Sequence, residues 1–181
     1  MKNFNYRLIL KATNFSAQKH IKQRRKDKFL TPYINHPVSV ALVIADIGRV
    51  DDSEVLAAAL LHDTLEDTET TPKELENEFG KKVCQYVLEV SDDMTLSKEE
   101  RKLKQIEHAK YLSEGAALIK LGDKISNLKD VINNPPDDWS LSRRKEYLVW
   151  AEKVIDNCPK VNDKLENRFK EIVKRGYEVL L

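Results

Sequence analysis

The sequence predicts an all-α protein, a compact single-domain helical bundle. Apolar residues recur at the spacing of three and four that marks one face of a helix. No alternating apolar and polar stretch with turn residues around it is present, so strands are not expected. The 5 glycines and 6 prolines are few for 181 residues, which also suits helices. One domain covering residues 1–181 is expected, because this length supports one hydrophobic core and no linker or repeat interrupts it.

Helix start and stop signals divide the chain into elements. Capping boxes begin at Thr71 and Ser97, and Pro37 fits the first helical position after a cap at Asn35 or His36. Glycines 48 and 80 fit helix ends, and prolines 135, 136 and 159 break the pattern. The expected helices cover residues 4–21, about three turns from 37 toward 48, 51 to about 63, 72–80, 83 to about 91, 97 to about 112, 114–132, 140 to about 158, and a last helix to about 175.

The amino-acid composition argues against some classes of binding partner. The 31 Lys and Arg and 30 Asp and Glu give a formal net charge of +1, so no general field attracts nucleic acid or a membrane surface. No apolar run is long enough to cross a membrane, and the apolar core near the N-terminus is too short for a signal peptide. Cys84 and Cys158 lack CxxC spacing, as is usual for reduced thiols. We expect a cytoplasmic protein, either a monomer or a homodimer, with no nucleic-acid or membrane partner.

Charged side chains gather at the end of an apolar helix. His62 and Asp63 follow the apolar residues 55–61, and Glu66 and Asp67 come one turn later on the same helix flanks. Buried carboxylates this close repel one another unless a positive charge lies among them. A metal ion is the simplest such charge, and the alternative is a helix end that reaches the surface and hydrates its acids.

Two more residues extend this pattern to a metal site. His36 stands at a helix start, and Asp123 interrupts the apolar side of helix 114–132. If both meet His62 and Asp63, two imidazoles and two carboxylates form a site suited to Mn²⁺, Fe²⁺ or Zn²⁺. Such an ion acidifies water, and nearby carboxylates can then move its protons.

Each residue also has an ordinary structural explanation. Taken alone, His36 is better explained as a helix-cap residue, and His62 as a hydrogen-bonded core histidine. Asp123 can pair with a lysine at position 120 or 124 on its own helix. Similarly, the basic residues around Arg25 are explained as a solvated loop or as a phosphate-binding one. The ordered set of residues, more than any single member, favours metal-assisted phosphoester hydrolysis.

The same ordered set resembles the HD phosphohydrolase superfamily, whose signature is a distant histidine, an adjacent His-Asp pair and a later aspartate. Residues 23–27, 31–37, 58–68 and 118–128 are similar to the hydrolase domain of RelA/SpoT proteins. The nearest type is the stand-alone small alarmone hydrolase, similar to the metazoan SpoT homologue. The resemblance implies a mononuclear Mn²⁺ enzyme that removes the 3′-diphosphate from ppGpp and pppGpp, giving pyrophosphate with GDP or GTP.

The resemblance also assigns roles by motif position. It implies that His36, His62, Asp63 and Asp123 are metal ligands and that Glu66 and Asp67 are catalytic acids. Substrate contacts are implied for a further set: Arg25, Lys26, Lys98, Arg101, Asn127, Arg143 and Tyr147. Gly122 stands where the family usually has Ala, and close packing is expected there.

Two other functions stay open at this point. One is an HD phosphohydrolase acting on another phosphorylated nucleotide, such as NADPH at its 2′-phosphate, because that reaction needs the same metal, water and basic pocket. The other is a non-catalytic nucleotide sensor on the same scaffold. The presence of all four ligands and both acids in this chain speaks against the sensor.

Overall fold

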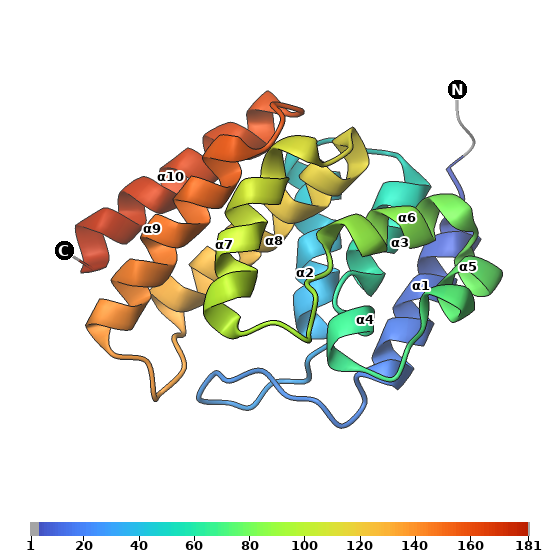
Figure 1. Cartoon of the computed structure of the whole chain (residues 1–181), viewed down its shortest axis with the longest axis horizontal. Coiled ribbons are helices and arrows are strands. Elements are labelled where there is room, and N and C mark those ends of the chain that lie inside the picture. Colours follow the sequence, from blue (N-terminus) through green and yellow to red (C-terminus); the bar gives the residue numbers. More distant parts are fainter. Residues whose placement is uncertain (1–3, 181) are drawn as a thin grey trace.

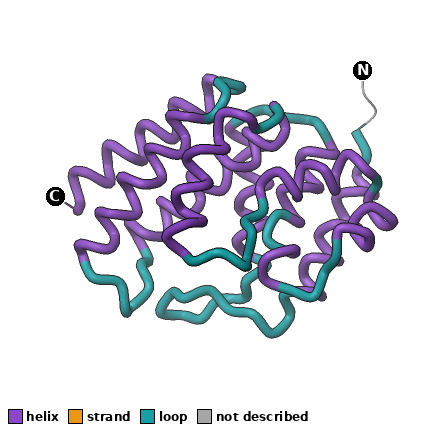
Figure 2. The backbone as a smooth tube through the Cα atoms, in the orientation of Figure 1, coloured by secondary structure: helices purple, strands orange, loops and turns teal. Residues whose placement is uncertain are grey.

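Helices make up the secondary structure of this computed structural model, which describes residues 4–180. No strand forms within that range, and the one β-contact is an isolated bridge between Arg24 and Pro32. The all-α prediction is confirmed (Figures 1 and 2). The elements are α1 (Tyr6–Lys19), α2 (Asn35–Leu42), the π-helix η1 (Val43–Ile47), α3 (Ser53–Leu61), α4 (Thr64–Asp67), α5 (Pro72–Phe79), α6 (Lys81–Val90), α7 (Lys98–His108), the 3₁₀-helix η2 (Ala109–Tyr111), α8 (Glu114–Asn133), α9 (Leu141–Asn157) and α10 (Asp163–Leu180).

Helices α3 and α8 lie at the centre of the fold. All residues of α3 except Glu54 are buried, as expected for a helix that is apolar on every side. Helix α8 packs against α2, α3, α6, α9 and α10, and most of its residues are buried. One cluster of buried apolar side chains extends from Ala12 in α1 to Leu180 in α10. Asp123 of the predicted site lies in α8 and His62 directly follows α3, so the core itself fixes where these side chains lie.

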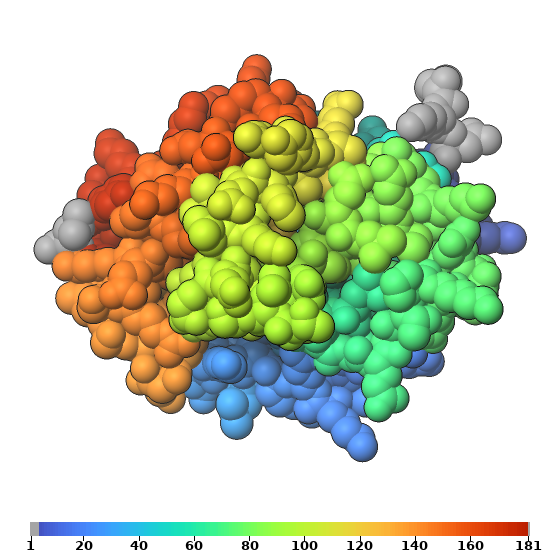
Figure 3. Space-filling view, in the orientation of Figure 1, coloured from blue at the N-terminus to red at the C-terminus, as the bar shows by residue number. Residues whose placement is uncertain are grey.

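The remaining helices surround this pair. Helix α1 packs against α3, while α9 and α10 lie side by side against α8 (Figure 1). Helix α7 packs against α9 and covers the face turned to the viewer in Figure 3. The basic segment between α1 and α2 crosses the lower edge of the molecule as a loop (Figure 2). This loop therefore lies beside the N-terminal end of α2, where His36 is found.

Capping side chains explain why several helices begin where the sequence predicts. The Ser97 hydroxyl accepts from the Glu100 N–H, and the Glu100 carboxylate accepts from the Ser97 N–H, which completes a capping box for α7. Thr71 accepts from the Glu74 N–H at the start of α5, and Ser140 caps α9. The predicted starts of these three helices are confirmed.

Some predicted boundaries were wrong. Helix α2 begins at Asn35, so neither Asn35 nor His36 is the cap and Pro37 is not the first helical residue. A proline fits here because the first-turn N–H groups have no partner inside the helix. Helix α7 stops at His108, before the expected position 112, because a 3₁₀ turn follows. Helix α10 continues to Leu180 and not to 175, because buried Leu180 packs into the core.

Close packing at Gly122 agrees with the sequence expectation. A Cβ atom built on Gly122 would lie 2.7 Å from Ile44 Cγ1 and 3.3 Å from Val40 Cγ1. The absence of a side chain therefore lets α8 approach the α2–η1 segment closely. This approach brings Asp123, the next residue of α8, toward His36 on α2.

Candidate active site

The break after α3 places His62 and Asp63 at the centre of the molecule. The helix ends at Leu61, and residues 62 and 63 form a turn before the short helix α4. The helix expected from residue 51 to about 63 thus ends at Leu61, and Glu66 and Asp67 lie on a separate short helix and not on the same helix flanks as His62 and Asp63. In this turn the Asp63 carboxylate lies against the imidazole of His62, with Asp63 Oδ2 3.1 Å from His62 Nε2.

Four side chains converge on one point: one from α2, two from the turn after α3 and one from α8. The His36 Nε2 atom lies 3.2 Å from Asp123 Oδ1 and 3.7 Å from Asp63 Oδ2. His62 Nε2 lies 3.1 Å from Asp63 Oδ2 and 3.7 Å from Asp123 Oδ1. Donor atoms of His36, His62 and Asp123 all lie within 4.8 Å of one another. The structure thus brings together the four residues that the sequence singled out.

The tautomer of His62 fits a metal ligand. The ring Nδ1 lies 2.8 Å from the Ala59 carbonyl oxygen, which can only accept a hydrogen bond, so Nδ1 carries the proton. In the neutral imidazole that can bind a metal, Nε2 is then the nitrogen with the free lone pair; it is buried and makes no hydrogen bond within residues 4–180. On the other histidine, His36 Nδ1 lies 3.4 Å from the Ser126 hydroxyl. Each imidazole thus has a neighbour at its Nδ1 atom, and its Nε2 atom faces the two carboxylates. Two imidazole nitrogens and two carboxylates are a donor set for a divalent cation.

The carboxylates and imidazoles of the cluster shift one another's pKa values toward their charged forms. Burial opposes ionisation of Asp123, but the Lys124 ammonium and the two imidazoles overcome it and hold the Asp123 pKa well below its usual range. Burial likewise opposes ionisation of Asp63, and His62 holds the pKa of that carboxyl low. In return, Asp63 and Asp123 outweigh burial and raise the pKa of His62.

Neighbouring side chains also donate hydrogen bonds to the two carboxylates. The Tyr33 hydroxyl donates to Asp63 Oδ2 at 2.7 Å, and burial followed by the Asp63 charge raises the pKa of that phenol. Lys124 Nζ donates to Asp123 Oδ2 at 3.0 Å, and Asn127 Nδ2 donates to Asp123 Oδ1 at 2.6 Å. These bonds fix the carboxylate planes before any ligand arrives.

Glu66 lies beside the cluster in a less polar environment. Burial, and then the negative charge of Asp63, raise the pKa of the Glu66 carboxyl to about 7. The backbone N–H of Asp92 donates to Glu66 Oε1 at 2.9 Å and partly offsets this rise. A carboxyl group with a pKa near neutrality can both accept and release a proton at physiological pH.

Asp67 points to a different place from Glu66. Its side chain is exposed, and Asp67 Oδ2 accepts a hydrogen bond from Gln23 Nε2 at 2.9 Å. Gln23 belongs to the loop between α1 and α2, so Asp67 ties α4 to that loop. Glu66 therefore contacts the segment between α6 and α7, whereas Asp67 contacts the loop between α1 and α2.

Two cavities flank the cluster and share Trp139 and Tyr147 as a common wall. The first, of about 350 Å³, lies under the basic loop; its lining includes Arg25, Lys26, Asp67 and Asn127 together with the shared aromatic pair. The second, of about 270 Å³, holds cationic side chains opposite Glu66; they are Lys98, Arg101, Lys102 and Arg143. All seven residues expected to contact substrate line one or both cavities.

Arg25 is tied down within the first cavity. Its guanidinium donates to Asp130 Oδ2 at 2.7 Å and to Asn127 Oδ1 at 3.2 Å, and it lies 5.6 Å from the Tyr33 ring centroid. The Asp130 ion pair is half-exposed, so an incoming anion can compete for this guanidinium.

Several residues of the site were not predicted from the sequence. Tyr33 and Lys124 hold the two carboxylates, and Trp139 and Trp150 continue an aromatic row with Tyr147 at ring distances of 5.5 and 5.2 Å. Lys124 was treated only as a competitor for Asp123, and the structure shows that the same contact orients the carboxylate. For Tyr33 the available signal was its position three residues before His36.

The described helices include none that is long and apolar enough to cross a membrane.

The chain is similar to a known protein family and to named relatives within it. A family model described as "HD domain" matches residues 12–152. Guanosine-3′,5′-bis(diphosphate) 3′-pyrophosphohydrolase MESH1 of Xenopus tropicalis is 50% identical over 161 residues, which is 89% of this chain and 90% of the relative. The human protein of the same name is 47% identical, over 92% of this chain and 93% of its own length.

A solved structure of a metazoan orthologue of SpoT that hydrolyses ppGpp also matches. It superposes with a TM-score of 0.91 at 44% identity, covering 96% of this chain and 97% of that one. The chain therefore belongs to the HD-domain family and, within it, to the group of proteins named MESH1.

Proposed function

We propose that this protein is a divalent-metal-dependent 3′-pyrophosphohydrolase of ppGpp and pppGpp, with residues 1–181 acting as one hydrolase domain. The observation that carries the proposal is the convergence of His36, His62, Asp63 and Asp123 beside a cavity of about 270 Å³ with four cationic side chains on its wall. Relatives that match nearly the whole chain at 44–50% identity carry that activity in their names.

The cluster would hold one cation through His36 Nε2, His62 Nε2 and the carboxylates of Asp63 and Asp123. Among divalent ions we propose Mn²⁺, which suits mixed imidazole and carboxylate donors. Such an ion, when bound, acidifies water and offsets the charge of a phosphate group. Removing any of the four residues should therefore abolish turnover and metal content together.

The chain's own residues supply the proton transfers and the binding energy. Hydrolysis adds water to the phosphorus attached to O3′, breaks the O3′–P bond, and needs one base and one proton donor. Glu66, with a pKa of about 7, is the proposed proton acceptor from water. Asp67, which lines the other cavity, is proposed as the second acid. Lys98, Arg101 and Arg143 would face the 3′-diphosphate and offset its negative charge while water attacks its phosphorus and O3′ leaves.

The nucleoside would occupy the other cavity. Arg25, Lys26 and Asn127 lie on its polar side, and Tyr147 offers an aromatic face near Trp139. The aromatic wall between the cavities gives a nucleotide one place for its base and another for its phosphates. This division supports a nucleotide with a diphosphate on its ribose as the substrate.

Parallel assays of the purified protein with Mn²⁺ test the proposal. We expect pyrophosphate and GDP from ppGpp, and none from His62→Ala, which should also lack bound manganese by elemental analysis. His108→Ala, a change of an exposed histidine on α7, is the matched control and should retain both properties. Release of orthophosphate from NADPH, with ppGpp left intact, would overturn the proposed substrate.

A further inference from the structure

The carboxylate of Glu66 is held by a residue far away in the chain. The hydrogen bond from the Asp92 N–H to Glu66 Oε1 joins residues 26 positions apart. Asp92 lies in the segment that connects α6 to α7, directly after the helix cap Ser91. The position of Glu66 thus depends on a connecting segment outside α4.

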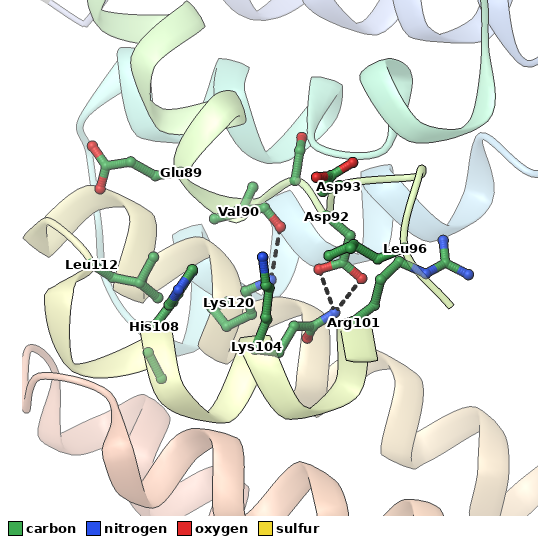
Figure 4. Close-up of a pocket in the computed structure, with 13 residues that line it drawn as sticks. Glu89, Val90, Asp92, Asp93, Leu96, Arg101, Lys104, His108, Leu112 and Lys120 are labelled. Atoms are coloured by element: carbon green, nitrogen blue, oxygen red, sulfur yellow. Dashed lines mark hydrogen bonds between the residues drawn. The ribbon is translucent and has the colours of Figure 1, made fainter. Parts of the chain in front are cut away.

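Two helices fix that connecting segment. From α7, Gln105 Nε2 donates to both carboxylate oxygens of Asp92, at 2.9 and 2.8 Å. From α8, the buried ammonium of Lys120 donates to the Val90 carbonyl oxygen at 2.8 Å. Figure 4 shows the contacts around Val90, Asp92 and Lys120 at a cavity of about 160 Å³. The backbone of residues 90–92 is therefore held at both ends.

The site of Gln105 is built for this contact. The side-chain nitrogen of Gln105 donates to both oxygens of Asp92, while Gln105 Oε1 is buried and has no hydrogen-bond partner within residues 4–180. Helix α7 is anchored in turn, because Trp150 Nε1 on α9 donates to the Lys102 carbonyl oxygen at 3.0 Å. Burying Gln105 Oε1 without a hydrogen-bond partner costs free energy, and the contact of Gln105 Nε2 with both oxygens of Asp92 offsets that cost.

We infer that Gln105 and Asp92 are positioning residues for the proton-transfer group Glu66. Gln105 orients Asp92, the Asp92 amide orients the Glu66 carboxylate, and Lys120 keeps the segment between them in place. This inference rests on the proposed function for the role of Glu66, but the hydrogen bonds themselves do not. Since a misplaced catalytic group loses rate steeply, loosening this relay should slow turnover without weakening substrate binding.

Gln105→Met tests the relay, because methionine keeps the length of the side chain and removes the donor. We expect kcat for ppGpp to fall by about 10-fold, with KM and bound manganese unchanged. Gln85→Met is the matched control: Gln85 Nε2 donates to Glu89 Oε1 at 2.9 Å in an equivalent amide–carboxylate contact on the exposed face of α6. That variant should keep the wild-type kcat.

A double variant separates positioning from a direct role. If Gln105 acts through Glu66, adding Gln105→Met to Glu66→Gln should leave the residual rate within about twofold, because the group being positioned is already lost. A further 10-fold fall in the double variant would overturn the inference, as would an unchanged kcat in Gln105→Met alone. A fall that accompanies loss of manganese would also overturn it, since the effect would then lie in the metal ligands.

Amide hydrogen exchange tests the relay without any assay of activity. The Asp92 N–H should exchange about 10-fold faster in Gln105→Met than in the wild type or in Gln85→Met. Unchanged exchange would overturn the inference even if the protein hydrolyses ppGpp. Conversely, if the wild type does not release pyrophosphate from ppGpp, the proposed function fails while this measurement still decides whether the relay exists.

Discussion

Replacing Glu66 by Gln should change how the stability of the metal-free protein depends on pH. Burial and the Asp63 charge raise the Glu66 pKa from 4.5 to about 7 in the folded protein. Between these values the folded state binds more protons than the unfolded state, so stability falls as pH rises. From pH 5 to pH 8 the difference amounts to roughly 2.5 kcal/mol, at 1.36 kcal/mol for each pKa unit. A glutamine at this position has no proton to lose and no such fall.

Urea unfolding of the metal-free wild type and Glu66→Gln at pH 5 and pH 8 measures this effect. The variant should gain roughly 2.5 kcal/mol relative to the wild type over that interval. Glu69→Gln, an exposed acid from the segment after α4, is the control and should shift by less than about 0.5 kcal/mol. If the two variants behave alike, Glu66 is not desolvated and the account of its raised pKa is refuted.

Three further outcomes follow from the same contacts. Lys124→Met leaves the buried Asp123 carboxylate without the ammonium 3.0 Å away, and should lower the free energy of unfolding by about 3 kcal/mol. Lys129→Met changes an exposed lysine of the same helix and, as the control, should leave that free energy unchanged. Gly122→Ala brings a Cβ to 2.7 Å from Ile44 Cγ1, and should reduce stability by about 1–3 kcal/mol in the same unfolding assay. A chelator added to the manganese-loaded protein should lower Tm by roughly 5–10 °C, and excess Mn²⁺ should restore it, because the ion binds only the folded chain.

The fold class and most helix starts could be predicted because they depend on local signals. Ser97 with Glu100 and Thr71 with Pro72 specify helix starts through contacts within four residues. Boundaries that depend on tertiary packing could not be predicted. The end of α10 is one: nothing local separates position 175 from Leu180, whose burial against distant helices extends the helix.

The residues of the site divide in the same way. His36, His62 and Asp123 stood out because each places a polar group in an apolar pattern. Tyr33 and Lys124 did not, since their roles depend on where the partner carboxylates lie in space. Sequence patterns indicate which polar side chains are unusual in their surroundings, and only the fold shows which ordinary ones orient them.

The turn that interrupts α3 also explains how one short motif serves both cavities. In a continuous helix, Glu66 and Asp67 would project about 100° apart from a fixed axis, while Asp63 would lie one turn below Asp67. Ending α3 at Leu61 lets α4 take its own direction. Glu66 can then reach the Asp92 amide near α7, and Asp67 can reach Gln23 in the basic loop. After the break, Glu66 lines one cavity and Asp67 the other, where a substrate spanning both cavities would meet each of them.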